Sequence, residues 1–265
     1  MRAIGPTRHV WVEEIMGTQI SIHIHCGGPR PAENAEPAVR ACFAELREID
    51  RVFSTYRHDS DISRMGRGEL DLKNADPRVA VVAAGCREAA AETDGLFSAH
   101  WAGSFDPTGY VKGWAVENAA RRHLQPLVHD AIAAGINAGG DMQLFTAADT
   151  DWSWNVAIAD PHRPGLAVAT MAITNGAVAT SGTGERGHHI IDPRTGQPAT
   201  GIAGATVVAD GLASADLWAT AAVVAGFENR SWIGRAETLT GLLVADDGRV
   251  SRWLGSTQID VTVAA

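Results

Sequence analysis

Apolar residues recur along the chain at two spacings, and each spacing predicts one type of element. Residues 18–26 alternate strictly between apolar and polar side chains, which predicts a strand with one buried and one solvated face. His23 and His25 fall on the polar face, so we expect both imidazoles in solvent rather than on a metal ion. Short apolar runs between turn signals predict further strands at residues 136–145, 152–160, 167–174, 176–181 and 203–210, and a hairpin at 240–255.

Helical spacing of apolar residues predicts five helices. One follows the turn at residues 106–109 and carries Arg121 and Arg122 near its end, where the helix dipole favours positive charge. Residues 53–70 lose the spacing and are rich in Ser, Asp and Gly, which predicts a loop. The other predicted helices span residues 33–53, 77–93, 127–134 and 212–226.

The order of these elements favours one fold class. Helices and mainly antiparallel strands are interspersed without a regular β-α-β alternation, which indicates an α+β fold. No linker rich in Pro, Gly or Ser divides the chain, so we expect a single domain over residues 1–265.

Composition narrows the range of partners. The chain has 45% hydrophobic and 20% charged residues, as an ordinary globular protein has, and a formal net charge of -9. That charge argues against nucleic acid or an anionic membrane as the main partner. The three cysteines lie among apolar residues without metal-binding spacing and are expected to be reduced core residues. No signal peptide or apolar run of about 18 residues is visible, so we expect a cytoplasmic protein without a membrane span.

Asp216 is the clearest anomaly, because it lies within a strongly apolar predicted helix. An unpaired buried carboxylate costs several kcal/mol, so this group must be solvated, capped or bound to something. Thr220 follows one turn later, and the two oxygens could form part of a Mg²⁺ site. A position in the N-terminal turn of the helix explains Asp216 equally well.

A second dense stretch runs from residue 179 to 198, ATSGTGERGHHIIDPRTGQP. Its two adjacent histidines, His188 and His189, follow a Gly-rich turn and could present one imidazole to a ligand or act as a general base. The chain has no Walker loop, no G-x-G-x-x-G motif and no nucleophile elbow.

Seven motifs together resemble the ApbE family, the FAD:protein FMN transferases, over nearly the whole chain. Each motif is weak alone, but all seven stand in the order found in the family. They are Met16–Thr18, Phe53–Ser63, Asp106–Glu117, Asn137–Asp141, Ala179–Gly182, His188–Gly196 and Ala215–Ala221.

The resemblance implies an α+β domain related to the T-fold and a phosphoryl-transfer reaction. FAD would be split at its pyrophosphate, the FMN phosphoryl group would pass to a threonine hydroxyl of an acceptor protein, and AMP would leave. Mg²⁺, or Mn²⁺ in its place, would bridge the phosphates. The acceptor is expected to carry a motif of the type Asp-x-x-Ser/Thr-Gly-Ala-Thr.

The resemblance also implies roles for individual residues. His189 matches the histidine implicated in transfer. The implied metal ligands are the side chains of Asp216 and Thr220 and the carbonyl of Gly109. The implied FAD contacts are Met16, Tyr56, Asp106, Lys112, Asp141, Ser181 and Ile191.

Two other functions remain open at this point. Within the same fold, water could replace the threonine, which would make the protein a Mg²⁺-dependent FAD pyrophosphatase that yields FMN and AMP. A protein of a different class would bind FAD and carry it without turnover.

Overall fold

The computed structural model describes residues 6–28, 35–182, 190–236, 238–255 and 257–261. Among these residues, nine strands form one sheet in the order β1-β2-β3-β4-β7-β10-β11-β12-β13, and every described pair is antiparallel. The strands are β1 Thr7–Ile15, β2 Thr18–Cys26, β3 Ala133–Ala138, β4 Asp141–Thr146, β7 Gly176–Gly182, β10 Ile202–Ala209, β11 Thr240–Ala245, β12 Val250–Leu254 and β13 Thr257–Val261.

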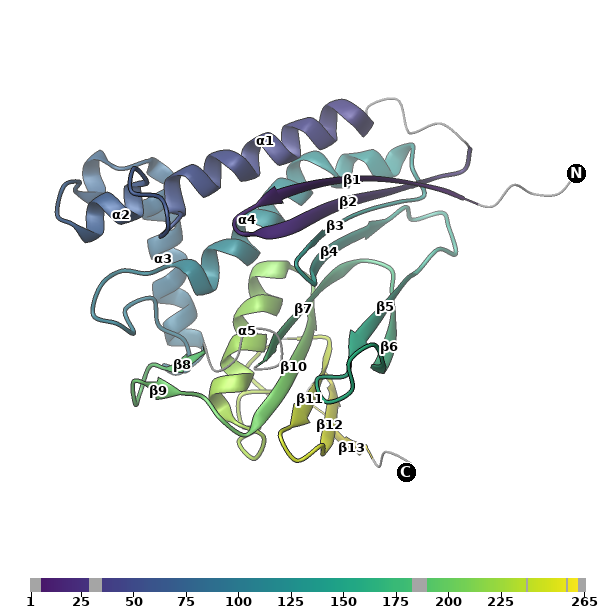
Figure 1. Ribbon diagram of the computed structural model, residues 1–265. Coiled ribbons are helices and arrows are strands. Elements are labelled where there is room, and N and C mark those ends of the chain that lie inside the picture. The colour runs from purple at the N-terminus through teal and green to yellow at the C-terminus, as the bar shows by residue number, and fades with distance from the viewer. Residues whose placement is uncertain (1–5, 29–34, 183–189, 237, 256, 262–265) are drawn as a thin grey trace, which may run out of the picture.

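Helices pack on one side of this sheet (Figure 1). Helix α5 lies against β7 and β10, α4 packs on α5, and α1 packs on α4 and β1, so the main hydrophobic core fills the space between sheet and helices. The helices are α1 Ala35–Phe53, α2 Asp61–Gly66, α3 Pro77–Glu92, α4 Thr108–His123 and α5 Leu212–Ala225, with short 3₁₀ turns at Leu72–Asn74 and Gln125–His129. No helix in the described ranges is long and apolar enough to cross a membrane.

A two-stranded ribbon covers part of the opposite face of the sheet. It consists of β5, Trp154–Ala159, and β6, Ala167–Ile173. Val156, Ile158 and Ile173 of the ribbon form a second core with apolar residues of β4, β7, β10, β11 and β12. A further pair of two-residue strands, β8 Ile191–Asp192 and β9 Gln197–Pro198, lies beside α5 in Figure 1.

The predicted helix at 127–134 is wrong. The chain makes a 3₁₀ turn that ends at His129 and then enters β3 at Ala133, because this segment pairs with β2 on one side and β4 on the other. Gly135 lets two side chains pack closely on this strand, since a Cβ atom would lie 2.8 Å from Cδ2 of Leu144 and 3.2 Å from the Trp154 ring. The single strand predicted at 136–145 is also wrong, because Gly139 and Gly140, with φ of 64° and 102°, form the turn between β3 and β4.

Other differences from the predicted elements have simple causes. The segment from 53 to 70 contains the short helix α2, which Ser60 caps by accepting a hydrogen bond from the N–H of Ser63 at 3.0 Å. The edge strands β1 and β13 were not predicted. In β1, half-buried and exposed positions alternate, so its hydrophobic signal is weak.

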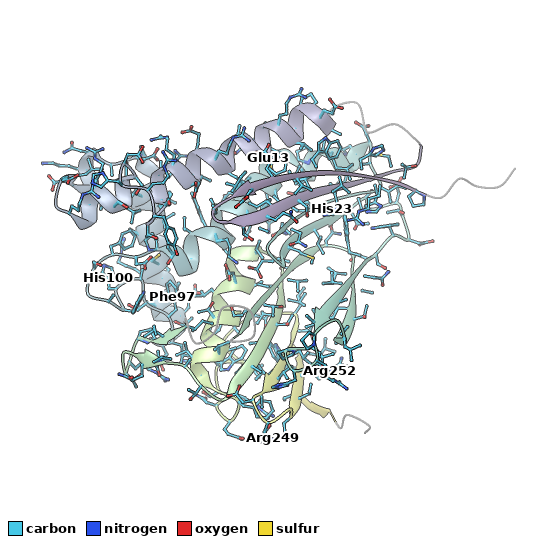
Figure 2. The ribbon with its side chains drawn as sticks, in the orientation of Figure 1. Glu13, His23, Phe97, His100, Arg249 and Arg252 are labelled. Atoms are coloured by element: carbon cyan, nitrogen blue, oxygen red, sulfur yellow. The ribbon has the colours of Figure 1, made fainter. Side chains whose placement is uncertain are left out.

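The expectation of solvated histidines on β2 holds for neither residue in full. His25 is only 8% exposed, because Trp152 and Trp154 pack on its ring with centroids 4.4 and 5.1 Å away. His23 is half-buried and accepts a hydrogen bond at Nδ1 from Arg8 Nε at 3.0 Å (Figure 2). Burial, and then the charge of Arg8, lower the pKa of His23 to about 4, so this ring is neutral at physiological pH.

Candidate active site

A cavity of about 1050 Å³ opens where several loops meet at one end of the sheet. This volume is at the upper end for small-molecule sites. Its walls come from the β1–β2 and β3–β4 turns, the end of α1, the start of α4, the end of β7, the β5–β6 turn and one face of α5. Every predicted site residue within the described part of the chain lines it: Met16, Tyr56, Asp106, Gly109, Lys112, Asp141, Ser181, Ile191, Asp216 and Thr220. The predicted catalytic residue His189 lies outside the described residues.

A charged cluster stands in the wall of this cavity. Lys112 of α4 forms an ion pair with Asp141 at the start of β4, and its Nζ lies 3.5 Å from Oδ2 of Asp216 on α5. The other oxygen of Asp141 accepts a hydrogen bond from the N–H of Thr180 at 3.0 Å. One lysine is thus shared by two carboxylates that come from two further elements.

Burial and the neighbouring opposite charges shift the pKa values of Lys112 and Asp216 in opposite directions. Burial lowers the pKa of Lys112, but the negative charges of Asp216 and Asp141 outweigh it, and the net pKa is raised. Burial raises the pKa of Asp216; Lys112 opposes this shift and Asp141 adds to it. Two acidic side chains thus face one basic side chain, so a further cation at this wall would meet carboxylate oxygens that Lys112 alone does not pair fully.

Asp216 lies in the second turn of α5, so the N-terminal-turn explanation for this carboxylate is wrong. Its side chain is buried against α4 because Gly113 allows the two helices to approach closely. A Cβ atom at Gly113 would lie 3.0 Å from both the Cβ of Asp216 and the carbonyl oxygen of Leu212. The glycine therefore sets how near α5 comes to the Lys112 side of the cavity.

Replacing Gly113 with Ala should lower the free energy of unfolding by about 1–3 kcal/mol, because the added methyl group pushes α4 and α5 apart. Gly66→Ala in α2 is a matched control, since no atom lies within 4 Å of the new Cβ position. Urea denaturation of both variants measures the difference. Equal stability of the two variants would show that the helices tolerate the separation.

Hydroxyl groups lie next to the carboxylate of Asp216. Thr220 follows Asp216 by one helical turn, and its Oγ1 lies 3.1 Å from Oγ of Ser181 at the end of β7. Together with the backbone of Gly109, these groups line the cavity with hard oxygen atoms. Such donors suit Mg²⁺, which completes its coordination with water and phosphate oxygens. Among the described residues, no group of three or more His, Cys, Asp or Glu side chains suited to a metal occurs.

Two sequence motifs far apart in the chain meet at the cavity edge. Met16 and Gly17 form the β1–β2 turn with φ of 57° and 69°, and Gly139 stands in the β3–β4 turn with φ of 64°. The hydroxyl of Thr18 occupies the space that a side chain at Gly139 would need. The two turns therefore pack directly on each other, and each holds the other in place.

The remaining predicted site residues differ in their contacts and in their exposure to solvent. Asp106 accepts hydrogen bonds from the N–H and hydroxyl of Thr108 at 3.0 and 2.7 Å, so it holds the first turn of α4 as well as lining the cavity. Tyr56 lies at the rim with 98% of its surface exposed. Ile191, in β8, lines the wall directly after the segment that holds His189.

Sequence reasoning missed two parts of the cavity. Trp101, 45% exposed, lines it from the segment that leads into α4, where Phe97 and His100 also lie (Figure 2). The β5–β6 turn at 160–165 forms another wall. Its D-P-H-R-P-G sequence signals a turn but gives no sign that the turn reaches a ligand site.

Comparison with known proteins places this chain in a family. A family model described as the ApbE family matches residues 16–103 and 99–243. The chain belongs to the ApbE family. An ApbE protein from Thermotoga maritima has a crystal structure that superposes with a TM-score of 0.77 at 22% identity, covering 93% of this chain and 97% of that one. This likeness confirms the predicted α+β fold.

Curated relatives share part of their length with this chain. The FAD:protein FMN transferase of Rhodobacter capsulatus is 34% identical over 154 residues, which is 55% of this chain and 29% of the relative. The enzyme of the same name from Treponema pallidum is 39% identical over 115 residues, which is 40% of this chain and 31% of the relative. The chain thus aligns with less than a third of the length of either relative.

Proposed function

We propose that this ApbE-family chain is an FAD:protein FMN transferase. The observation that carries the proposal is the cavity wall where Lys112, Asp141 and Asp216 meet beside the hydroxyls of Ser181 and Thr220. Phosphoryl transfer depends mainly on positioning and charge neutralisation, and this wall offers one lysine, two carboxylates and several hard oxygens. The names of the curated relatives support the same activity.

The residues present fit a divalent cation at this wall. Asp216, Thr220 and the carbonyl of Gly109 would hold Mg²⁺, with Mn²⁺ as the alternative. When bound, the cation supplies charge neutralisation and orientation of the FAD phosphates. Lys112 would add a second positive charge from the α4 side, while Asp141 fixes the position of the lysine.

In the proposed reaction, the threonine oxygen of the acceptor forms a bond to the phosphorus of the FMN half. The bond from that phosphorus to the bridging oxygen of the pyrophosphate breaks, and AMP leaves with the oxygen. The threonine proton passes to a base, for which we propose His189. The two residues that follow it in sequence, Ile190 and Ile191, line the cavity, which supports this role.

Incubating the protein with FAD and Mg²⁺, with and without a peptide that carries the Asp-x-x-Ser/Thr-Gly-Ala-Thr motif, tests the proposal. A transferase produces AMP and a fluorescent flavin bound covalently to the peptide. Free FMN in both reactions would identify a pyrophosphatase instead, and unchanged FAD would identify a carrier. Adding EDTA should abolish the transfer if the cation is required.

Replacing His189 with Ala should lower the rate of transfer by about 10²-fold, because a positioned base contributes at least that factor. His188→Ala is the matched control, since it removes the neighbouring imidazole and leaves the proposed base, His189, in place. Quantifying the flavinylated peptide over time checks both variants. A His189→Ala variant that transfers flavin at the parental rate would exclude this residue as the base.

A further inference from the structure

Helix α5 carries Asp216 and Thr220, but its own N-cap residue provides no side-chain hydrogen bond to its first turn. Its N-cap residue is Gly211, which has no side chain to accept the N–H groups of the first turn. Two side chains from other elements accept them instead. Glu117 of α4 accepts from the N–H of Ala213 at 2.9 Å, and Gln143 of β4 accepts from the N–H of Leu212 at 3.0 Å.

Both capping side chains are fixed by further hydrogen bonds. The second oxygen of Glu117 accepts from Nε of Arg121 at 2.8 Å, and this arginine also donates to the carbonyl of Asp210 at 3.1 Å. Gln143, only 1% exposed, donates through Nε2 to the carbonyls of Gly176 and Asp210 at 3.2 and 3.3 Å. The start of α5 is therefore tied to α4, β4 and the preceding turn at once.

The carboxylate of Glu117 also leaves no space beside Gly211. A Cβ atom there would lie 2.5 Å from both of its oxygens. A self-capping residue such as Ser or Asp at this position would meet the Glu117 carboxylate and would fit only if that side chain moved. The first N–H groups of the helix are instead capped from α4 and β4.

The three elements joined by this cap are the three that form the charged cluster. Lys112 and Glu117 both belong to α4, and Asp141 and Gln143 lie two positions apart on β4, on one face of the strand. Asp216 lies one turn beyond the capped N–H groups on α5. The cap thus fixes the start of α5 relative to α4 and β4, the two elements that also carry Lys112 and Asp141.

We propose that Glu117 and Gln143 are positioning residues for the candidate cation site. By accepting the first N–H groups of α5, they set where the oxygens of Asp216 and Thr220 lie in the cavity wall. The negative charge of Glu117 at the start of the helix adds a favourable interaction with the helix dipole. The inference rests on the proposed function for its biological meaning, but its physical content is the affinity of the site for a divalent cation.

The test measures Mn²⁺ binding to the FAD-free protein by electron paramagnetic resonance, so it does not depend on flavin transfer. Glu117→Ala should raise the Kd for Mn²⁺ by about 10-fold, the usual effect of losing a group that orients a ligand. Glu117→Gln keeps an oxygen acceptor and should stay within about 3-fold of the parent. Glu88→Ala, on the exposed side of α3, is the control and should leave the Kd unchanged.

Hydrogen exchange at the amide of Ala213, which donates to Glu117, shows whether this part of the cap is lost, while Leu212 keeps Gln143 as its acceptor. Faster exchange at Ala213 in Glu117→Ala with an unchanged Kd for Mn²⁺ would overturn the positioning role, and unchanged exchange at Ala213 would overturn the cap. If Glu117→Ala does not fold, Glu117→Asp, which withdraws the carboxylate by one methylene, should raise the Kd by about 3-fold or more. A parent protein that binds Mn²⁺ but transfers no flavin would contradict the proposed function and leave this inference standing.

Discussion

Replacing Asp216 with Asn should lower the rate of flavin transfer by about 10³-fold and leave the protein at least as stable as the parent. The activity should fall because, in the proposed site, the amide would offer a divalent cation a neutral oxygen in place of a carboxylate. The stability should not fall, because the pKa of Asp216 is raised by burial. A raised pKa means that ionisation is easier in the unfolded chain than in the folded protein. The charged group therefore lowers the free energy of unfolding at neutral pH.

Two measurements on Asp216→Asn check this expectation: the rate of peptide flavinylation at saturating Mg²⁺, and urea denaturation. Lys112 keeps Asp141 as its partner in this variant, so the substitution leaves no unpaired cation. Asp149→Asn, on the exposed β4–β5 loop, is the control for the substitution itself. Loss of activity together with a large loss of stability would mean that Asp216 holds the fold and not the cation.

Replacing Lys112 with Met should lower the free energy of unfolding by about 3 kcal/mol and abolish measurable transfer. The methionine fills a similar volume but leaves Asp141 and Asp216, both buried, without their shared cation. Removing one partner of a buried ion pair typically costs 3–5 kcal/mol, and the partly exposed Lys112 places this case at the lower end. Lys73→Met, at an exposed position, should change the stability by less than about 0.5 kcal/mol.

A divalent cation should compensate for the missing lysine. Adding Mg²⁺ should raise the unfolding midpoint of Lys112→Met by more than that of the parent, because the two carboxylates are then free to bind it. The double variant Lys112→Met/Asp216→Asn should regain part of the lost stability, since one of the two like charges is gone. A Lys112→Met protein that unfolds at the parental urea concentration would show that solvent reaches the cluster and screens it.

The sequence predicted the local parts of this protein well. Asp216 and Thr220 were visible as an anomaly because they stand one turn apart in an otherwise apolar helix, and a helix brings such residues to one face without help from the rest of the chain. The alternation of residues 18–26 likewise located β2.

Local sequence patterns could not predict the features that depend on contacts between distant segments. Lys112 and Asp141 are 29 residues apart, and only the packing of α4 on β4 brings them together. His25 occupies a polar position in its strand, yet two tryptophans more than 120 residues later cover it. The 127–134 segment has helical spacing, but the two strands beside it determine its conformation. In each case the deciding contact is non-local.

Tyr56, at the open rim of the cavity, has a consequence for the proposed binding of FAD. With 98% of its surface exposed, the ring is free to sample several rotamers before any ligand arrives. If FAD holds the ring in one orientation, the loss of rotamer freedom at this side chain makes the binding free energy less favourable by about 0.5–1.5 kcal/mol. A neighbouring substitution that packed the ring in its bound orientation would therefore tighten FAD binding without adding a single contact to the substrate.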